Sequence, residues 1–295
     1  MERNIQIYKK SAQENIKSIE AILRMLNTKN PPIALYEKLL DQSSSLITSR
    51  WQSGRKYART KFVQQAFGTL YPSPQTMISL SVDAMVNILD DLFDENLNKD
   101  AKAQYILEFL RVFALFSSKA ETEIQKFMGM YMNKLITLAA AEGFYKEQIL
   151  QEKNIDAIMK HSADLLLCRG MDIDIFVRIA LLKQRIGQPA KDSIQKIARV
   201  FRALNILKKD IGDITHDREN GIQTITVVVL EKSYINFNAY IKELIDCLLA
   251  RQSLLIKAYP SKKNVRNKVY DMVASKFQRM TLVQKQEIGK RLKLL

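Results

Sequence analysis

The pattern of hydrophobic and polar positions predicts helices along almost the whole chain. Apolar residues recur three and four positions apart, and only 9 Gly and 6 Pro interrupt the 295 residues. That spacing places apolar side chains on one face of an α-helix. We therefore predict an all-α protein that forms one domain over residues 1–295. The expected helices cover residues 3–27, 34–49, 101–117, 120–141, 144–169, 191–209, 235–256 and 264–278, with a basic C-terminal tail.

One segment departs from the helical pattern. Residues 224–229 have the sequence Thr-Ile-Thr-Val-Val-Val, and β-branched residues of this kind favour a strand. A single strand among so many helices would have no partner for its backbone hydrogen bonds. We therefore predict a buried helix here.

A cluster of carboxylates ends an apolar run that begins near Met77. The cluster is Asp90-Asp91-Leu92-Phe93-Asp94-Glu95, and Ser73 and Pro74 form a good helix start before the run. On a helix, Asp90 and Asp94 share a face. Carboxylate oxygens suit hard cations such as Mg²⁺, which takes one or two of them together with phosphate oxygens. The alternative is a solvated helix end, although acidic residues there oppose the helix dipole.

A second acidic stretch lies far downstream, between Lys208 and Gly221. If the preceding helix continues through it, Asp210, Asp213 and Asp217 fall at positions i, i+3 and i+7. That spacing predicts one stripe of carboxylates, which would match the first cluster.

The chain is strongly basic, with 46 Lys and Arg against 31 Asp and Glu and a net charge of +15. Nucleic acid, an anionic membrane surface and a phosphorylated substrate are all compatible with this excess. Cys168 and Cys247 have no metal-type spacing, and we expect buried thiols. No run reaches the roughly 18 apolar residues of a membrane span, and the first residues lack a signal peptide. We expect a cytoplasmic protein, and peripheral membrane association stays open.

The two acidic stretches together resemble those of the class I isoprenoid synthases, which include trans-prenyltransferases, squalene and phytoene synthases and terpene cyclases. Residues 90–94 match the DDxxD motif of that superfamily. A Gly-basic segment, Gly54 to Arg59, precedes this motif by about 35 residues, and Lys160-His161-Ser162 precedes the second stretch by about 50. In trans-prenyltransferases the corresponding segments contact diphosphate.

The resemblance implies a single large helical bundle around a central apolar cavity. It implies an enzyme that binds an allylic prenyl diphosphate with up to three Mg²⁺ ions and ionises it with release of pyrophosphate. Asp90, Asp91 and Asp94 would be the catalytic carboxylates. The implied metal ligands are Asp90, Asp94, Asp210, Asp213 and Asp217, and the implied diphosphate contacts are Arg55, Lys56, Arg59, Lys160 and Lys209.

Three departures from the family pattern bear on the reaction. Lys209 stands where the second motif of trans-prenyltransferases has its first Asp, and Glu95-Asn96 follows the first motif where an Arg-Arg pair is usual. Asn205 alone does not complete the metal-binding triad of terpene cyclases. Because the missing Arg-Arg pair binds isopentenyl diphosphate in that family, we favour cyclisation or rearrangement over chain elongation.

Other interpretations stay open. One is a prenyltransferase that elongates or couples prenyl chains, and another is a non-catalytic partner subunit, which Lys209 would explain. A third is a basic helical protein that binds nucleic acid or a membrane, although no nucleic-acid motif is present and we expect no such partner. A homodimer follows only from the resemblance.

Several further residues have both a functional and a structural interpretation. Asp83, seven residues before Asp90, could steer a cation or a water in a cavity, or it could be a hydrogen-bonded core residue. His161 and His216 lack metal-type spacing and fit surface or packing roles better. The aromatic residues Phe93, Phe109, Phe113 and Phe116 could stabilise a carbocation, but their helical spacing favours the core.

Overall fold

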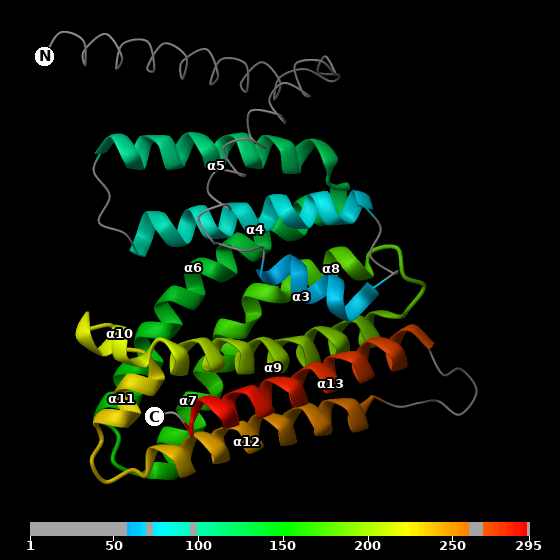
Figure 1. Cartoon of the computed structure of the whole chain (residues 1–295). Helices are drawn as coiled ribbons and strands as arrows, with labels where there is room; N and C mark the ends of the chain where they lie inside the picture. Colours follow the sequence, from blue (N-terminus) through cyan, green and yellow to red (C-terminus); the bar gives the residue numbers. More distant parts are fainter. Residues whose placement is uncertain (1–57, 69–72, 95–98, 260–267, 294–295) are drawn as a thin grey trace, which may run out of the picture. The chain divides into compact units, whose positions relative to one another are not determined.

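The computed structural model describes residues 58–68, 73–94, 99–259 and 268–293. These residues form α-helices and one short 3₁₀ helix, and they contain no strand, which confirms an all-α fold for this part of the chain. The first two expected helices and the residues Arg55 and Lys56 lie outside it. The elements (Figure 1) are α3 (Ala58–Phe67), α4 (Ser73–Asp94), α5 (Lys99–Lys119), α6 (Thr122–Gln151), α7 (Ile155–Arg169), η2 (Gly170–Ile173), α8 (Asp174–Leu181), α9 (Gln188–Gly212), α10 (Ile214–Glu219), α11 (Ile225–Glu231), α12 (Phe237–Ala258) and α13 (Lys268–Arg291).

The chain divides into two compact units. Unit 1 comprises residues 1–62 and 71–125, and unit 2 comprises residues 63–70 and 126–295. Two helices, α3 and α6, contribute residues to both units. The single domain expected from the sequence stays a prediction.

Helices α4 and α5 pack along one another in unit 1. Their shared core includes Val82 and Met85 from α4 and Val112 and Phe116 from α5, all nearly inaccessible to solvent. Phe116 is therefore a core residue, as its spacing favours. Phe113 is 37% exposed, and its ring stacks with those of Phe109 and Phe116.

Helix α9 is the central element of unit 2. It packs against α7, α8, α12 and α13, and α13 runs alongside it in Figure 1. Its buried residues lie on more than one face, because Ile194, Phe201 and Leu204 are buried together with Val200 and Leu207. A helix with apolar residues on several faces must be surrounded by other elements.

The segment with strand propensity is a helix. α11 begins after Thr224, whose hydroxyl accepts a hydrogen bond from the Val227 amide at 3.4 Å, and residues 225–229 are all buried. Burial against α9 and α10 outweighs the local β-propensity. The prediction of a buried helix is confirmed.

Three helix boundaries differ from the prediction. The expected break near Gly143 is wrong, because α6 runs through this exposed glycine to Gln151. The break comes at Asn154, whose side-chain oxygen accepts hydrogen bonds from the amides of Asp156 and Ala157 and so caps α7. The last expected helix ends too early, because α13 continues to Arg291 and contains most of the predicted basic tail.

The remaining expectations concern the burial of the two cysteines and the absence of a membrane-spanning helix. Cys168 and Cys247 are free thiols that are partly exposed rather than fully buried, and burial raises the pKa of Cys168. Within the described ranges, no helix is both long and apolar enough to cross a membrane.

Candidate functional site

The second acidic stretch lies at the junction of α9 and α10. α9 ends at Gly212, and Asp213, with φ −101° and ψ 3°, ends α9 and begins α10. The helix therefore does not continue through this stretch, and its carboxylates do not follow the single stripe that an unbroken helix would give. The junction stays compact, because the Asp217 amide donates to the Asp213 carbonyl at 2.8 Å.

Asp210 is held in an ion pair near the end of α9. Its carboxylate accepts a hydrogen bond from Arg169 Nη1 at 2.7 Å, and Asp210 is only 4% exposed. Arg169 also lies 3.8 Å from Glu142 on α6. Burial alone lowers the pKa of Arg169, but the two carboxylates outweigh it and raise that pKa above its ordinary value. Asp210 is therefore neutralised by a protein cation.

Asp217 is a buried carboxylate without such a partner. It is 8% exposed, and it has no hydrogen bond or ion pair to its side chain among the described residues. Burial, followed by the charges of Asp210 and Asp213, raises its pKa above the usual value. His216 and Lys209 offset this only in part. A buried carboxylate in this state favours the approach of a cation.

A series of ion pairs fixes the α7–α8 corner against α9. Arg199 binds Asp174 through two hydrogen bonds of 2.7 and 2.6 Å, and Arg202 binds Asp172 in a similar two-pronged manner. Gly170 allows the close approach, since a Cβ there would lie 2.6 Å from the Arg199 carbonyl oxygen. This corner carries Arg169 at the end of α7 and so positions it beside Asp210.

A second cation reaches the acidic stretch from the end of α13. The Arg291 guanidinium packs against Gly212 so closely that any side chain at residue 212 would displace it. A 2.7 Å ion pair between Lys208 and Glu287 holds this end of α13 on α9. A side chain at residue 212 would therefore move the guanidinium of Arg291 away from this position.

Three residues around the acidic stretch, Arg169, Glu142 and Arg291, were not expected from the sequence. Arg169 lies 41 residues before Asp210, and its only sequence signal is its position at the end of a helix. Arg291 is one of several cations in a basic C-terminal region. Neither has a recognisable motif, because their proximity to the acidic stretch depends on helix packing.

The two lysines expected to contact diphosphate lie in different surroundings. Lys209 is exposed at the end of α9, and its charge lowers the pKa of Asp217. Lys160 is exposed on α7, nine residues before Arg169. Nine residues correspond to two and a half helical turns, so the two side chains leave opposite sides of α7. The structure therefore does not bring Lys160 to the Arg169–Asp210 pair.

The first acidic motif occupies the last turn of α4 in unit 1. Its backbone is helical, while the side chains of Asp90, Asp91 and Asp94 lie outside the described part of the structure. In an unbroken helix, positions 83, 87, 90 and 94 share a face. The motif therefore continues a face whose earlier residues are described.

Arg59 is bound to that face of α4. Its Nη1 donates to Asp83 at 3.1 Å and to Asn87 at 3.0 Å, and the Thr60 amide donates to Asp83 at 3.0 Å. Asp83 is completely buried, so it is a hydrogen-bonded core residue, which agrees with the structural interpretation of its role. Asn87, which Arg59 contacts, precedes residues 90 and 94 on this helix by about one and two turns.

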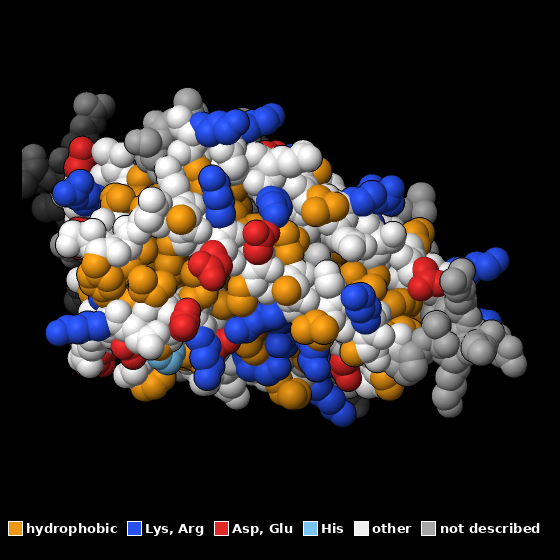
Figure 2. Space-filling view, turned by 90° about the horizontal axis from the view of Figure 1, so that it is seen from below, with side chains coloured by type: hydrophobic (Ala, Val, Ile, Leu, Met, Phe, Trp, Pro, Cys, Tyr) orange, Lys and Arg blue, Asp and Glu red, His pale blue; other side chains and the backbone are white. Residues whose placement is uncertain are grey.

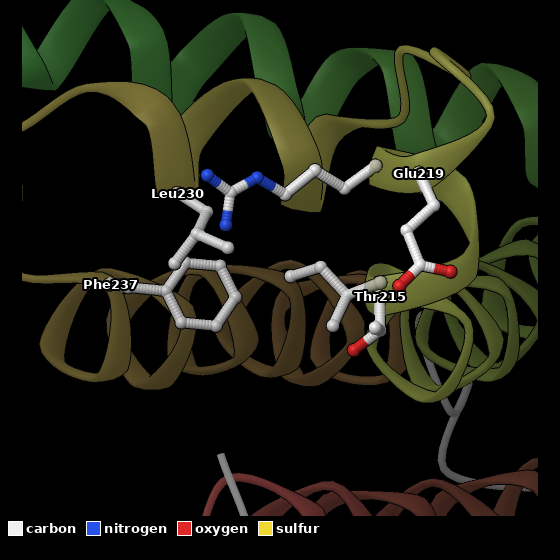
Figure 3. Close-up of a pocket in the computed structure, with 6 residues that line it drawn as sticks. Thr215, Glu219, Leu230 and Phe237 are labelled. Carbon is white, nitrogen blue, oxygen red and sulfur yellow. The ribbon is translucent and has the colours of Figure 1, made fainter.

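A surface pocket of about 430 Å³ is lined by residues of α10 together with Leu230 and Phe237. Figure 3 shows Leu230 and Phe237 side by side in this pocket, facing Thr215 and Glu219 on α10. Ile214 and Arg218 complete its lining, which does not include Asp210, Asp213 or Asp217. The carboxylates of the acidic stretch therefore do not line this pocket.

The acidic stretch fits part of a metal site. Among the described residues, no group of three or more His, Cys, Asp or Glu side chains is arranged to hold a metal ion. Mg²⁺ commonly takes only one or two carboxylates and completes its shell with water and phosphate oxygens. The buried, unpaired carboxylate of Asp217, with Asp213 nearby, fits that requirement.

None of the family models, curated proteins and solved structures compared with this chain matches it.

Proposed function

We propose that this protein is a Mg²⁺-dependent isoprenoid synthase that ionises an allylic prenyl diphosphate and then cyclises or rearranges the chain. The observation that carries the proposal is the buried, unpaired carboxylate of Asp217 beside Asp210 and Asp213. A charge kept in such surroundings costs stability, which is typical of functional sites. The all-α fold and the DDxxD sequence at residues 90–94 support the same chemistry.

The side chains of unit 2 would have different roles in binding Mg²⁺ and the diphosphate. Asp213 and Asp217 would hold Mg²⁺, whereas Asp210 is already neutralised by Arg169 and would orient that arginine. Mg²⁺, when bound, neutralises the negative charge of the diphosphate and of the leaving pyrophosphate. Lys209, whose charge acts on Asp217, and Arg291, which packs against Gly212, would bind the diphosphate oxygens directly.

The first acidic motif would contribute the other carboxylates. We propose Asp90 and Asp94 as further ligands, with Asp91 supporting them, and Arg59 as a cation held on the same face of α4. We also propose that the fold is a bundle around a central apolar cavity, which would exclude water and shape the hydrocarbon chain. Up to three Mg²⁺ ions would be bound.

The decisive experiment measures pyrophosphate release with Mg²⁺ from geranyl, farnesyl and geranylgeranyl diphosphate, each with and without isopentenyl diphosphate. We expect hydrocarbon or alcohol products that isopentenyl diphosphate leaves unchanged. Asp90→Asn and Asp217→Asn should each lower the rate by at least about a hundredfold. Asp271→Asn, which removes an exposed carboxylate of α13, should retain the rate.

Other outcomes would separate the alternatives. Longer prenyl diphosphates formed only with isopentenyl diphosphate would show chain elongation instead. No turnover of any substrate by a folded protein would contradict the proposal.

Lys209 favours a second candidate, a non-catalytic partner subunit. It occupies the first position of the second motif as an exposed cation where a carboxylate is usual in the resembling family. The exposed side chain can be replaced without repacking, so Lys209→Asp tests its role cleanly. Turnover that appears only in Lys209→Asp, or only after mixing with an active homologue, would support the partner subunit.

A further inference from the structure

The outer face of α13 carries a line of cations and apolar side chains. Successive residues three and four apart along one side of this helix are Lys268, Met272, Lys276, Arg279, Val283, Gln286 and Lys290, and all seven are exposed. We call these residues the α13 stripe. Over 22 residue steps the stripe extends roughly 33 Å along the helix.

The charges of the stripe have one sign. It contains four cations and no acidic residue, and none of the four takes part in an ion pair among the described residues. The acidic residues of α13 lie elsewhere on the helix, since Glu287 is paired with Lys208 and Asp271 lies to one side of the stripe. The stripe therefore favours an anionic partner that is itself extended.

The apolar members of the stripe narrow the choice of partner. Met272 is 45% exposed and Val283 is 50% exposed, and Leu282 at the edge is 48% exposed. The opposite face of α13 already packs into unit 2 through Tyr270 and Phe277, so these three residues are not core residues exposed at the margin. In Figure 2, Lys and Arg side chains lie among hydrophobic ones on the face of the molecule that is seen from below.

We propose that the α13 stripe docks this protein on an anionic phospholipid surface. A helix with cations and apolar side chains on one exposed face lies in the plane of such a surface, with the cations at the lipid phosphates and the apolar groups among the upper acyl carbons. A nucleic acid backbone would leave Met272, Leu282 and Val283 unused. The stripe also has no aromatic side chain on which a base could stack.

The proposal does not depend on the proposed enzymatic function. It uses only residues of α13. Arg291, which packs against Gly212, follows the last residue of the α13 stripe but is not part of it. A protein that fails to turn over prenyl diphosphates could still dock in this way.

Sedimentation of the full chain with vesicles tests the proposal. Vesicles would contain phosphatidylcholine alone or phosphatidylcholine with 30% phosphatidylglycerol. We expect the protein to bind the anionic vesicles and to bind the neutral ones at least tenfold more weakly. Lys276→Glu with Arg279→Glu should weaken binding to the anionic vesicles at least tenfold.

Two further variants distinguish the stripe from a general charge effect. Lys153→Glu with Lys242→Glu makes the same change in net charge at exposed positions outside α13 and should bind like the original chain. Met272→Ser with Val283→Ser keeps every cation, and it should weaken binding at least threefold in 0.5 M salt, where charge attraction is screened.

Three results would overturn the proposal. One is equal binding by the two charge-reversal variants, and another is no binding to anionic vesicles by the folded protein. The third is tight binding to duplex RNA that needs Lys276 and Arg279 but is unaffected by Met272→Ser with Val283→Ser, because that result would assign the stripe to nucleic acid. Circular dichroism of each variant establishes that its helices are intact.

Discussion

At the scale of single residues, two buried aspartates in the acidic stretch of unit 2 differ in whether a cation is bound to them. Asp210 and Asp217 are both nearly inaccessible to solvent, yet only Asp210 has an arginine against it. The paired residue is a structural group. The unpaired residue, whose pKa is raised, is the better candidate for binding a cation.

The raised pKa of Asp217 predicts a stability change with a definite sign. Its neutral form suits the folded state, so its contribution to stability is present below the unfolded-state pKa and is lost as the pH rises through the higher folded-state pKa. Asp217→Asn should therefore raise the melting temperature by a few degrees at pH 7. Below about pH 4 the variant and the original chain should melt together, because both side chains are then neutral.

Melting curves between pH 3 and pH 8 check this expectation, with Asp213→Asn as a partly exposed comparison. Adding Mg²⁺ and pyrophosphate at pH 7 should stabilise the original chain and not Asp217→Asn. A lower melting temperature for Asp217→Asn at pH 7 would show that the carboxylate has a stabilising partner.

At the scale of elements, the crossing of α9 over the α7–α8 corner positions Arg169. Gly170 permits this crossing by lacking a side chain, and its backbone, with φ −65°, is unstrained. The requirement for glycine is therefore steric. The ion pairs of Arg199 and Arg202 also fix the orientation of α9 on this corner, since each arginine binds a different aspartate of the corner.

Gly170→Ala should be destabilising by about 1–3 kcal/mol, because the new Cβ would meet the Arg199 carbonyl and force the helices apart. Gly143→Ala is a matched control in the exposed interior of α6, where a Cβ meets nothing within 4 Å. That change should stabilise the protein by about 0.5–1 kcal/mol through helix propensity. Urea unfolding of both variants measures the difference, and equal free energies of unfolding would contradict the close crossing.

At the scale of the whole molecule, the cooperativity of unfolding depends on how the chain divides into units. The chain forms two compact units, but α3 and α6 each supply residues to both. If either unit unfolds, it must therefore disrupt part of a helix that also belongs to the other unit. We expect calorimetry to show one transition whose calorimetric and van't Hoff enthalpies agree, as for a single domain. Two separated transitions would show that the units are independent domains.

Most of the helical framework could be predicted from the sequence, whereas its breaks were harder. Gly143 was expected to end a helix, but one exposed glycine costs an otherwise well-packed helix only about 1 kcal/mol. Asn154 does end it, since its side chain caps the next helix. The helix expected to end at residue 209 continues to Gly212, and its break at Asp213 changes how the acidic residues are arranged.

The sequence by itself determined the helical class, the burial of residues 225–229 and the positions of the two acidic stretches. These follow from periodicity and composition, which act over one or two turns of chain. The tertiary structure alone decided that Asp210 has Arg169 as its partner, that Arg291 covers Gly212 and that the Asp217 side chain has no ion-pair partner among the described residues. Those contacts join residues that are distant along the chain, and they exist only because packing of the apolar helix faces brings their helices together.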